Sequence, residues 1–354
     1  MYRKFLLPVI TDEKKGFYGG LIRWCLLIFA FIFTAIQWGV RNCYRLRILK
    51  VKKIPKPVIS IGNITTGGSG KTPLTIYLSK AFKQQQIRPV VLMRGYMAEP
   101  SADSRSDEQI MIQEAVTDVP VICQANRYQG AMHYLKQQEA DVFILDDGFQ
   151  HWKLLRDLDI VVIDATSPWS NGYMLPRGLL REPVKQLKRA GLIVLTKTDL
   201  GRKNLKGIYQ TLAEVCPGTE VCETIHEPTG LMNMKTHVAL KLTDMSRPPV
   251  VALSSIGSPQ GFEMTLRRLD YRIEDHVIYE DHHVYQRQEI VNIKAQCVKK
   301  DVQHIITTHK DAVKIQPYLE QTDDSVQWFY LSVELKFVKG EDCFLERAAH
   351  ILQR

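Results

Sequence analysis

The sequence predicts an α/β protein in which helices cover both faces of a parallel sheet, followed by a second, smaller α/β domain. From Pro57 onward, short apolar runs alternate with segments of helical periodicity, which is typical of βαβ units. The alternation stops between His226 and Pro248, in a stretch that contains Pro228 and Gly230, and then resumes. We therefore predict a first domain over residues 51–226, a linker over 227–248 and a C-terminal domain over 249–354.

An apolar segment precedes these domains. Residues 24–40 are 17 residues without a formal charge, bounded by Arg23 and Arg41. A helix of that length reaches roughly 26 Å, slightly short of a hydrocarbon core of about 30 Å. Trp24 and Trp38 stand near its ends, where aromatic rings lie at membrane interfaces. Residues 1–50 are therefore predicted to form a membrane-anchoring helix with a basic collar; a buried core helix and a cleaved signal peptide are the alternatives.

Basic residues dominate the stretch after this segment. Such an excess predicts that this end faces the cytoplasm and contacts anionic headgroups. The whole chain has 47 basic against 38 acidic residues, a balance that suits anionic lipid, a phosphorylated substrate or nucleic acid. The seven cysteines include no Cys-x-x-Cys pair, which argues for reduced thiols in the cytosol and against a disulfide framework or a zinc site. The collar comprises Arg41, Arg45, Arg47, Lys50, Lys52, Lys53 and Lys56.

The predicted strands are short runs rich in Val, Ile and Leu. In the first domain they cover residues 58–61, 89–93, 119–123, 142–145, 159–163 and 192–195, with helices after Lys71, over 108–115 and 128–138, and in part of 183–190. In the C-terminal domain we expect strands at 250–253, 276–279, 304–307 and 326–331, and helices at 260–269, at 286–299 and from about Asp342. Active residues of such folds gather beyond the C-terminal ends of the strands.

A glycine-rich turn follows the first predicted strand and precedes a helix. Such a turn directs backbone N–H groups at phosphate, Lys71 can reach the outer phosphates, and the Thr72 hydroxyl can ligate Mg²⁺. Thr65 stands where the motif G-x-x-x-x-G-K-[ST] has its first glycine, so the loop is a variant. We predict a P-loop NTPase-like sheet that binds ATP and Mg²⁺. The predicted nucleotide-binding residues are Thr65, Thr66, Gly67, Gly68, Ser69, Gly70, Lys71 and Thr72.

Two carboxylates end the strand predicted at 142–145. Beside a phosphate-binding loop, Asp146 or Asp147 can hold Mg²⁺, and the other can orient the nucleophile. A solvated turn is the alternative. Gln150 and His151 follow closely, as candidates for substrate contact.

Arginines stand at two further sites. Arg127 opens a helix, where the dipole disfavours a cation, and binding a phosphate would explain it. Arg177, Arg181 and Glu182 lie in a loop with prolines and a glycine. Two arginines held in this way suit bidentate capture of an anion, whereas a solvated loop is the alternative.

Weaker motifs leave alternatives open. Asp107 precedes an amphipathic helix and can serve chemistry or only as an N-cap. The stretch 196–199, Thr-Lys-Thr-Asp, resembles the base-reading motif of GTPases, with a structural or adenine-side role as the alternative. Residues 281–285 contain an acid, two imidazoles and a phenol, which suits a general base or a surface turn but not zinc. Asp311, at the start of a helix, is a candidate link to the opposite domain.

Together these motifs resemble the tetraacyldisaccharide 4′-kinase family, which phosphorylates a lipid disaccharide 1-phosphate at the inner membrane of Gram-negative bacteria. The resemblance covers nearly the whole chain, and the loop joined to Asp-Asp-Gly-Phe-Gln-His is its most specific part. Two stretches depart from the family pattern: residues 106–109 read Ser-Asp-Glu-Gln for Gly-Asp-Glu-Pro, and 308–311 read Thr-His-Lys-Asp for Thr-Glu-Lys-Asp, which leaves the role of His309 open. The motifs are the N-terminal helix, Gly62 to Pro73, Arg94 to Tyr96, Asp146 to His151, Leu175 to Pro183, Asp281 to His283 and Lys310 to Lys314.

The resemblance implies roles for individual residues. Asp107 would pair with His282 to activate the sugar hydroxyl, with His282 preferred over His283 because it directly follows the aspartate. The two would come from different domains, which predicts closure before chemistry. Thr65 to Thr72 would bind ATP; Arg127, Asp147 and Glu182 would serve catalysis or Mg²⁺; Tyr96 and Arg181 would lie near nucleotide or substrate.

The predicted activity is transfer of the γ-phosphoryl group of ATP to the 4′-hydroxyl of a tetraacyldisaccharide 1-phosphate in lipid A biosynthesis. Expected partners are the lipid disaccharide 1-phosphate and anionic inner-membrane lipids, with no nucleic acid and no obligate protein partner. The expected location is the cytoplasmic face of the bacterial inner membrane. The rival readings are a membrane-tethered regulatory ATPase of the partitioning type, which has a lysine where this chain has Thr66, and a membrane GTPase.

Overall fold

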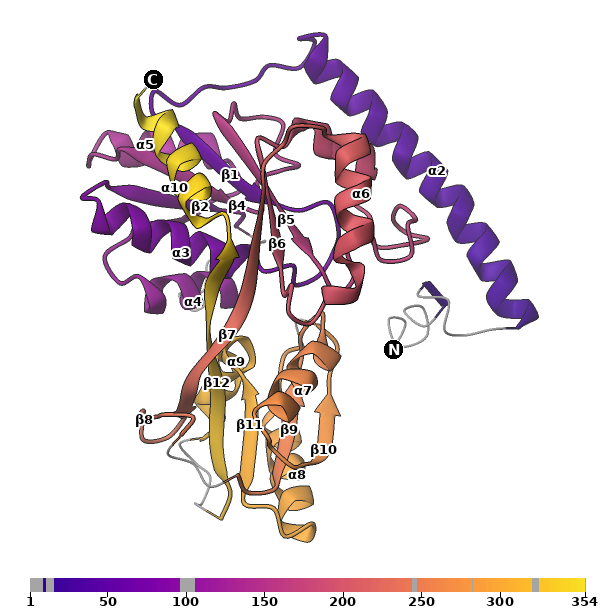
Figure 1. The fold of residues 1–354 in the computed structure, drawn as a ribbon, viewed down its shortest axis with the longest axis vertical. Coiled ribbons are helices and arrows are strands. Elements are labelled where there is room, and N and C mark those ends of the chain that lie inside the picture. The colour runs from indigo at the N-terminus through magenta and orange to yellow at the C-terminus, as the bar shows by residue number, and fades with distance from the viewer. Residues whose placement is uncertain are drawn as a thin grey trace. The chain divides into compact units, whose positions relative to one another are not determined.

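The computed structural model describes residues 9–10, 16–95, 106–243, 247–281, 283–319 and 325–353. The chain divides into two compact units, which are described separately below (Figure 1). Unit 1 comprises Met1–Ser104, Ile112–Ile225 and Phe337–Arg354, and unit 2 comprises Arg105–Met111 and His226–Lys336. Two predicted site residues, Tyr96 and His282, lie outside the described residues.

Unit 1 is built on a parallel sheet with the strand order β3-β2-β4-β1-β5-β6-β7. The central strand β1 pairs in parallel with β4 and β5, and all of its residues are buried. A run of Val and Ile suits this position because a central parallel strand is covered on both faces. The strands are β1 (Val58–Gly62), β2 (Pro89–Met93), β3 (Val121–Cys123), β4 (Val142–Asp146), β5 (Leu158–Asp164), β6 (Leu192–Thr196) and β7 (Val221–Asn233), of which β7 ends within unit 2.

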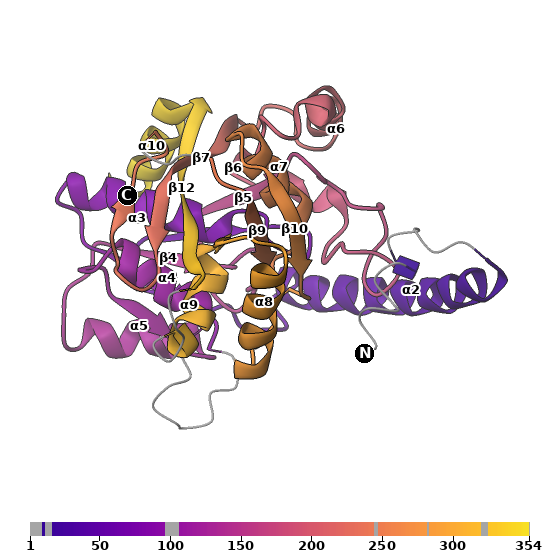
Figure 2. The ribbon, with the colours of Figure 1, turned by 90° about the horizontal axis from the view of Figure 1, so that it is seen from below.

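Helices cover both faces of this sheet. On one face, α5 (Arg127–Leu135) packs against β1 and β4, and α6 (Leu205–Val215) packs against β5 and β6. On the other face, α3 (Lys71–Gln84) covers β1, β2 and β4. Helix α10 (Glu341–His350) lies beside α3, where the rings of Tyr77 and Phe344 are 5.9 Å apart (Figure 2). Short 3₁₀ helices occupy Val184–Arg189 (η1), Arg202–Asn204 (η2) and Ile351–Gln353 (η3), and α4 (Asp107–Ala115) begins in unit 2 and ends in unit 1.

The strands of unit 2 pair in parallel in the order β10-β9-β11-β12. Apolar side chains of α7 pack on one face, and those of α8 and α9 pack on the other around Trp328. A two-stranded antiparallel pair joins β8 to the end of β7. The elements are β8 (Ala239–Leu240), β9 (Val250–Ser254), α7 (Pro259–Arg268), β10 (Ile273–Ile278), α8 (Arg287–Lys299), β11 (His304–Thr308), α9 (His309–Leu319) and β12 (Gln327–Lys339).

The predicted α/β class with parallel, helix-covered sheets is confirmed. The details differ from the sequence prediction at three places. Helix α6 was not predicted, and strand β7 begins before the predicted linker and continues into it, where the sequence indicates only short possible strands. Residues 337–354 belong to unit 1, although the sequence prediction assigned them to the C-terminal domain. Residues 105–111 belong to unit 2.

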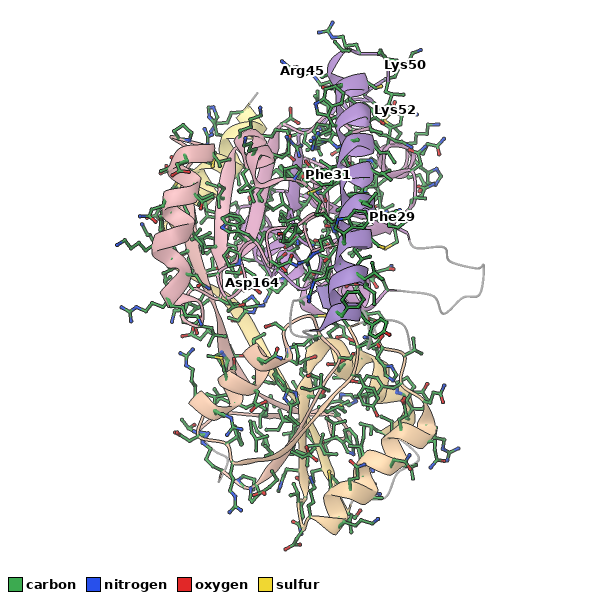
Figure 3. The ribbon with its side chains drawn as sticks, turned by 90° about the vertical axis from the view of Figure 1, so that its right-hand side faces the viewer. Phe29, Phe31, Arg45, Lys50, Lys52 and Asp164 are labelled. Atoms are coloured by element: carbon green, nitrogen blue, oxygen red, sulfur yellow. The ribbon has the colours of Figure 1, made fainter. Side chains whose placement is uncertain are left out.

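Helix α2 (Phe17–Arg45) extends beyond the predicted apolar segment at both ends. By length and composition, it is the one helix among the described residues that could cross a membrane. Phe29 and Phe31 are 59% and 69% exposed, and the basic residues Arg45, Lys50 and Lys52 gather at its C-terminal end (Figure 3). This distribution favours the anchor over a buried core helix, because a core helix would cover its aromatic side chains.

Candidate active site

The loop between β1 and α3 has the backbone of a phosphate-binding turn. Gly67 and Gly70 have φ values of 105° and 94°, a region that favours glycine. A Cβ atom at Gly67 or Gly68 would meet no described atom within 4 Å, so this side of the loop is open. Helix α3 begins at Lys71, and no side chain among the described residues caps its first turn. Its N–H groups and dipole therefore remain available to an anion.

The two aspartates at the end of β4 meet the start of α3. The Lys71 ammonium lies 3.5 Å from Oδ1 of Asp147. Thr75, one turn along α3, donates a 3.0 Å hydrogen bond to Oδ1 of Asp146. Arg181 donates to both carboxylate oxygens of Asp147, at 3.0 and 2.8 Å. The predicted juxtaposition of the loop lysine with the acidic pair is present in unit 1.

The two carboxylates have different proton affinities. Burial raises the pKa of Asp146 to about 6, although Lys71 acts in the opposite direction. Burial also raises the pKa of Asp147, but the positive charges of Lys71 and Arg181 outweigh it and lower that pKa to about 2. Asp147 therefore keeps its charge at any physiological pH, whereas Asp146 titrates near the lower end of that range.

These residues fit Mg²⁺ held together with a nucleotide. Asp146 and Asp147 supply hard oxygen ligands, and Thr72 lies partly exposed in the first turn of α3. No cluster of three or more His, Cys, Asp or Glu that could hold a metal occurs in the described part of the chain. Mg²⁺ fits this donor set because it is usually bound through one or two carboxylates together with substrate phosphates and water.

Arg127 contacts the backbone of Asp146 and Asp147. The side chain is only 3% exposed and donates to the backbone oxygens of Asp146 and Asp147, at 2.9 and 3.2 Å. Asp147 has a φ of 53°, an uncommon region for a residue with a side chain. The contacts of Arg127 thus explain a cation at the start of α5 without a phosphate, since the guanidinium holds the acidic turn in place.

The predicted anion-capturing arginines have separate partners. Arg181 binds Asp147, as described above, whereas Arg177 donates to the backbone oxygen of Ile10 at 3.0 Å and lies over the Tyr173 ring. Glu182 is fully buried, with an oxygen 2.6 Å from Arg189 and 3.7 Å from Arg41. The structure therefore brings Arg181 to the acidic pair and places Glu182 in an arginine cluster.

Gln150 contacts the residues that support the loop, and His151 follows it in the chain. Gln150 donates to the backbone oxygen of Asn63 at 2.8 Å, and Asn63 donates to the Ser69 hydroxyl at 2.9 Å. Burial and the charge of Arg127 lower the pKa of His151 to about 4, so its imidazole is neutral at pH 7. These contacts give Gln150 a supporting role beneath the loop, and substrate contact by either residue stays a prediction.

The start of the loop is tied to a neighbouring segment. Thr66 donates its backbone N–H to the oxygen of Leu179 at 2.8 Å, and Thr65 forms a bridge with Leu180. Thr65, which replaces the usual first glycine, is thus held in an extended pairing. A residue with a side chain suits such a pairing, because extended backbone does not require glycine.

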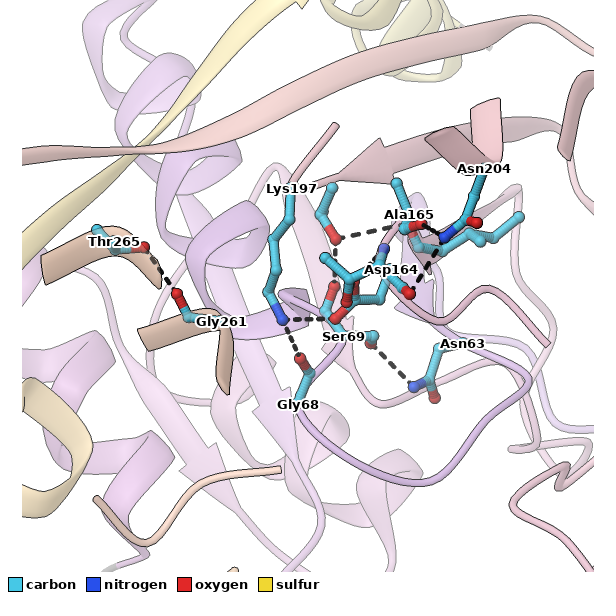
Figure 4. Close-up of polar contacts among 12 residues, drawn as sticks. Asn63, Gly68, Ser69, Asp164, Ala165, Lys197, Asn204, Gly261 and Thr265 are labelled. Carbon is cyan, nitrogen blue, oxygen red and sulfur yellow. Dashed lines mark hydrogen bonds and ion pairs between the residues drawn. The ribbon is translucent and has the colours of Figure 1, made fainter. Parts of the chain in front are cut away.

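Sequence reasoning missed that Thr196 and Lys197 hold the loop from the end of β6, and Figure 4 shows Lys197 beside Gly68. Lys197 donates to the backbone oxygen of Gly68 at 3.2 Å and forms an ion pair with Asp164. Thr196 donates its hydroxyl to the backbone oxygen of Ser69 at 2.8 Å. The sequence pattern that could have revealed them is Thr-Lys-Thr-Asp at 196–199. The contacts of Thr196 and Lys197 support the structural role that was one alternative for this motif.

Predicted residues of the C-terminal half lie in unit 2. His283 is 2.9 Å from a Glu289 oxygen, and its ring stacks on Tyr279 at 4.3 Å. His309 stacks on Tyr330 at 4.6 Å. Both imidazoles are therefore part of aromatic packing.

Two expectations about unit 2 need correction. Asp311 was expected to link to the opposite domain, but its carboxylate accepts from the backbone N–H of Ser255 at 2.9 Å and from the Thr308 hydroxyl at 2.7 Å, both in the same unit. Asp107 was expected to belong to the first domain, but residues 105–111 belong to unit 2, where Lys314 lies 3.1 Å from its carboxylate. Asp107 and the stretch around Asp281 therefore belong to one unit, contrary to the expectation that they come from different domains and need closure to meet.

A loop with this geometry, joined to an acidic pair at the neighbouring strand end, is typical of proteins that bind nucleoside triphosphates. The family model of tetraacyldisaccharide-1-P 4′-kinase (LpxK) matches residues 22–351. The chain belongs to this family. The resemblance inferred from the sequence motifs is thereby confirmed.

Individual relatives of this kinase family align over most of their length. The chain is 32% identical to the tetraacyldisaccharide 4′-kinase of Halothermothrix orenii over 364 residues, covering 95% of this chain and 94% of the relative. It is 32% identical to the enzyme of that name from Shewanella halifaxensis, covering 93% and 94%. Among solved structures, the "apo" form of LpxK from Aquifex aeolicus in complex with ATP matches with a TM-score of 0.68 and 28% identity, over 94% of this chain and 99% of that one.

Proposed function

We propose that this chain transfers the γ-phosphoryl group of ATP to the 4′-hydroxyl of a tetraacyldisaccharide 1-phosphate, giving lipid IVA in lipid A biosynthesis. The observation that carries the proposal is the meeting of Lys71, at the start of an uncapped helix, with Asp146 and Asp147 at the end of β4. Membership of the tetraacyldisaccharide-1-P 4′-kinase family supports the lipid disaccharide as acceptor.

The loop residues Thr65 to Thr72 would bind the triphosphate of ATP. Backbone N–H groups at the start of α3 and the Lys71 ammonium neutralise negative charge, and Lys197 and Thr196 keep the loop in the conformation that presents those groups. Thr72, Asp146 and Asp147 would hold Mg²⁺. When bound, Mg²⁺ neutralises charge on the phosphate oxygens.

Three charged residues would support the acidic pair. Arg127 holds the two backbone carbonyls, so that the carboxylates project from a fixed turn. Lys71 and Arg181 together lower the pKa of Asp147, and Arg181 would also contact an anionic group of the nucleotide or lipid. Glu182 contributes through Arg189 and Arg41, rather than as a metal ligand. Tyr96, Gln150 and His151 are proposed to line the path of the substrate.

The acceptor hydroxyl would be activated by Asp107 together with His282. An aspartate beside an imidazole orients it and stabilises its protonated form, which is the arrangement of a general base. The packing of His283 against Glu289 and Tyr279 supports His282 as the base, because it gives His283 a structural role.

Helix α2 and the collar would hold the enzyme at the cytoplasmic face of the inner membrane. Exposed aromatic side chains on α2 suit the acyl region, and the basic residues that follow suit anionic headgroups. An acylated substrate resides in the same layer. Anionic lipids are thus the proposed partner surface, with neither nucleic acid nor an obligate protein partner required.

The testing experiment supplies purified protein with Mg²⁺, the lipid disaccharide 1-phosphate, and either ATP or GTP. We expect the lipid to gain one phosphate with ATP, detected by mass spectrometry. Preference for GTP would support the GTPase reading, and ATP turnover that ignores the lipid would support the regulatory ATPase. Either outcome would contradict the proposal.

A further inference from the structure

Two lysines on α9 have no role in the function described so far. Lys310 and Lys314 are four residues apart, and therefore lie on one face of the helix. Lys314 lies 3.1 Å from Oδ2 of Asp107. Lys310 lies 3.2 Å from Oδ1 of Asp281 and 3.7 Å from Oε1 of Glu108. All five residues belong to unit 2.

These ion pairs join two segments that are far apart in the sequence. Asp107 and Glu108 form the first turn of α4, and Asp281 directly precedes His282. Lys310 contacts both segments at once. One face of α9 thus contacts Asp107, which is proposed to act in catalysis, and Asp281, which precedes the proposed base in sequence.

Helix α9, which carries both lysines, is held in unit 2 by a buried hydrogen-bonded aspartate and by apolar packing. Asp311, between the two lysines, is fully buried and accepts hydrogen bonds from the backbone N–H and hydroxyl of Ser255. Ala312 and Ile315 pack into the core of unit 2. The side chain of Lys314 is only 11% exposed. A lysine on a packed helix, largely removed from solvent, holds its partner in a narrower range of positions than a surface ion pair does.

We propose that Lys310 and Lys314 are positioning residues for Asp107, the carboxylate that the proposed function assigns to activation of the acceptor hydroxyl. Lys314 fixes the carboxylate of Asp107, and Lys310 ties the turn that carries Asp281 to the first turn of α4. The inference rests on the proposed function, since it assigns these lysines to the same phosphoryl transfer. It also gives each charged residue of the stretch Lys-Asp-Ala-Val-Lys at 310–314 a role. Asp311 holds α9 in the core of unit 2, and the two lysines contact the acidic residues.

The first test compares Lys314→Met with a matched control, Lys300→Met, whose ammonium pairs with Asp275 at an exposed site of unit 2. Because misplacing a catalytic group is costly, we expect Lys314→Met to lower kcat for lipid phosphorylation by about 10–100-fold. The KM for ATP should stay within about twofold, since transition-state positioning and not ground-state binding is lost. Lys300→Met should match the wild type in both constants. Lys314→Arg should recover part of kcat, because it restores the cation.

The second test is a double-mutant cycle with Asp107→Asn. If Lys314 acts through Asp107, the double variant should be no slower than Asp107→Asn alone. Losses that multiply, or a Lys314→Met variant with wild-type kcat, would overturn the inference. Should Lys314→Met fail to fold in a thermal unfolding measurement, Lys314→Gln takes its place in the same cycle.

The two proposals fail in different ways. A wild-type protein that does not phosphorylate the lipid refutes the proposed function and removes this inference with it. A wild-type protein that is active, with a slow Asp107→Asn variant and a fast Lys314→Met variant, leaves the function standing and refutes the positioning role alone.

Discussion

The ammonium of Lys71 lies 3.5 Å from a carboxylate oxygen of Asp147, which links the phosphate-binding loop to the end of β4. The pair joins the residue that we propose to bind phosphate to one of the two residues that we propose to hold Mg²⁺. Since Asp147 has a lowered pKa, its carboxylate stays ionised without a ligand. The loop is therefore organised for a triphosphate before one binds, which reduces the cost of binding.

Lys71→Ala should lower phosphoryl transfer by about 10²-fold or more, because it removes a cation from the developing charge. The fold should survive, since Asp147 keeps Arg181 as a partner. Lipid phosphorylation and circular dichroism measure the two effects. Lys80→Ala, on the exposed face of the same helix, serves as control and should behave like wild type. Transfer by Lys71→Ala at the control rate would refute the phosphate-binding role.

Lys197→Met should weaken ATP binding, because Gly68 loses its contact beneath the loop. We expect the KM for ATP to rise about tenfold, and the free energy of unfolding to fall by about 2 kcal/mol, as for a buried hydrogen bond to a charged group. Lys188→Met, at an exposed position of unit 1, is the control. An unchanged KM for ATP in Lys197→Met would show that the loop does not depend on this contact.

The same ion pair predicts a pH dependence of stability. The charge of Lys197 outweighs burial and lowers the pKa of Asp164 in the folded state, so the unfolded state binds its proton first as the pH falls. The stabilisation is present above the unfolded pKa of about 4 and is lost as the pH falls through the folded value. Urea unfolding should therefore show a large difference between wild type and Lys197→Met at pH 7 and a smaller one at pH 3. A difference that stays constant would contradict the pairing.

Asp107→Asn and His282→Ala should each slow lipid phosphorylation, and the double variant should be about as slow as the slower single variant. Residues that act as one unit give such non-additive losses. The initial rate at saturating ATP is the quantity to compare. His283→Ala is the matched control, and we expect a smaller loss there because its imidazole contacts Glu289 and Tyr279. Independent losses from Asp107 and His282 would break the proposed pair.

Replacing Phe29 and Phe31 by Glu should reduce binding to vesicles of anionic phospholipid, because both side chains are exposed on α2. Activity on detergent-dispersed lipid should change much less. Val298→Glu places the same charge on an exposed position of α8 and should leave vesicle binding unchanged. Equal sedimentation of all three proteins with vesicles would rule out α2 as the anchor.

The parts of the fold and site that could be predicted are those that depend on short, continuous stretches of sequence. The apolar run of β1, the glycines before Lys71 and the paired aspartates after β4 each form a local pattern, and the parallel sheet brings their ends together. Parallel strands meet at one edge of the sheet, which is why the site itself was foreseeable.

Partners set by tertiary packing could not be predicted in this way. Lys197 supports Gly68 from 129 residues away, and its motif resembles one with a different use. The place of Arg127 at a helix start predicted phosphate binding, which stays a prediction, but its contacts with the backbone carbonyls of Asp146 and Asp147 could not be foreseen from that position. Asp107 belongs to unit 2 and pairs there with Lys314, and no local sequence pattern links two residues so far apart in the chain.

The most direct test of the central claim follows label from the γ-phosphate of ATP with wild type and Lys71→Ala side by side. The account predicts that wild type moves the label onto the lipid disaccharide at its 4′ position, and that Lys71→Ala leaves it on ATP. Equal labelling of the lipid by both proteins, or release of the label by wild type only as free phosphate, would contradict it.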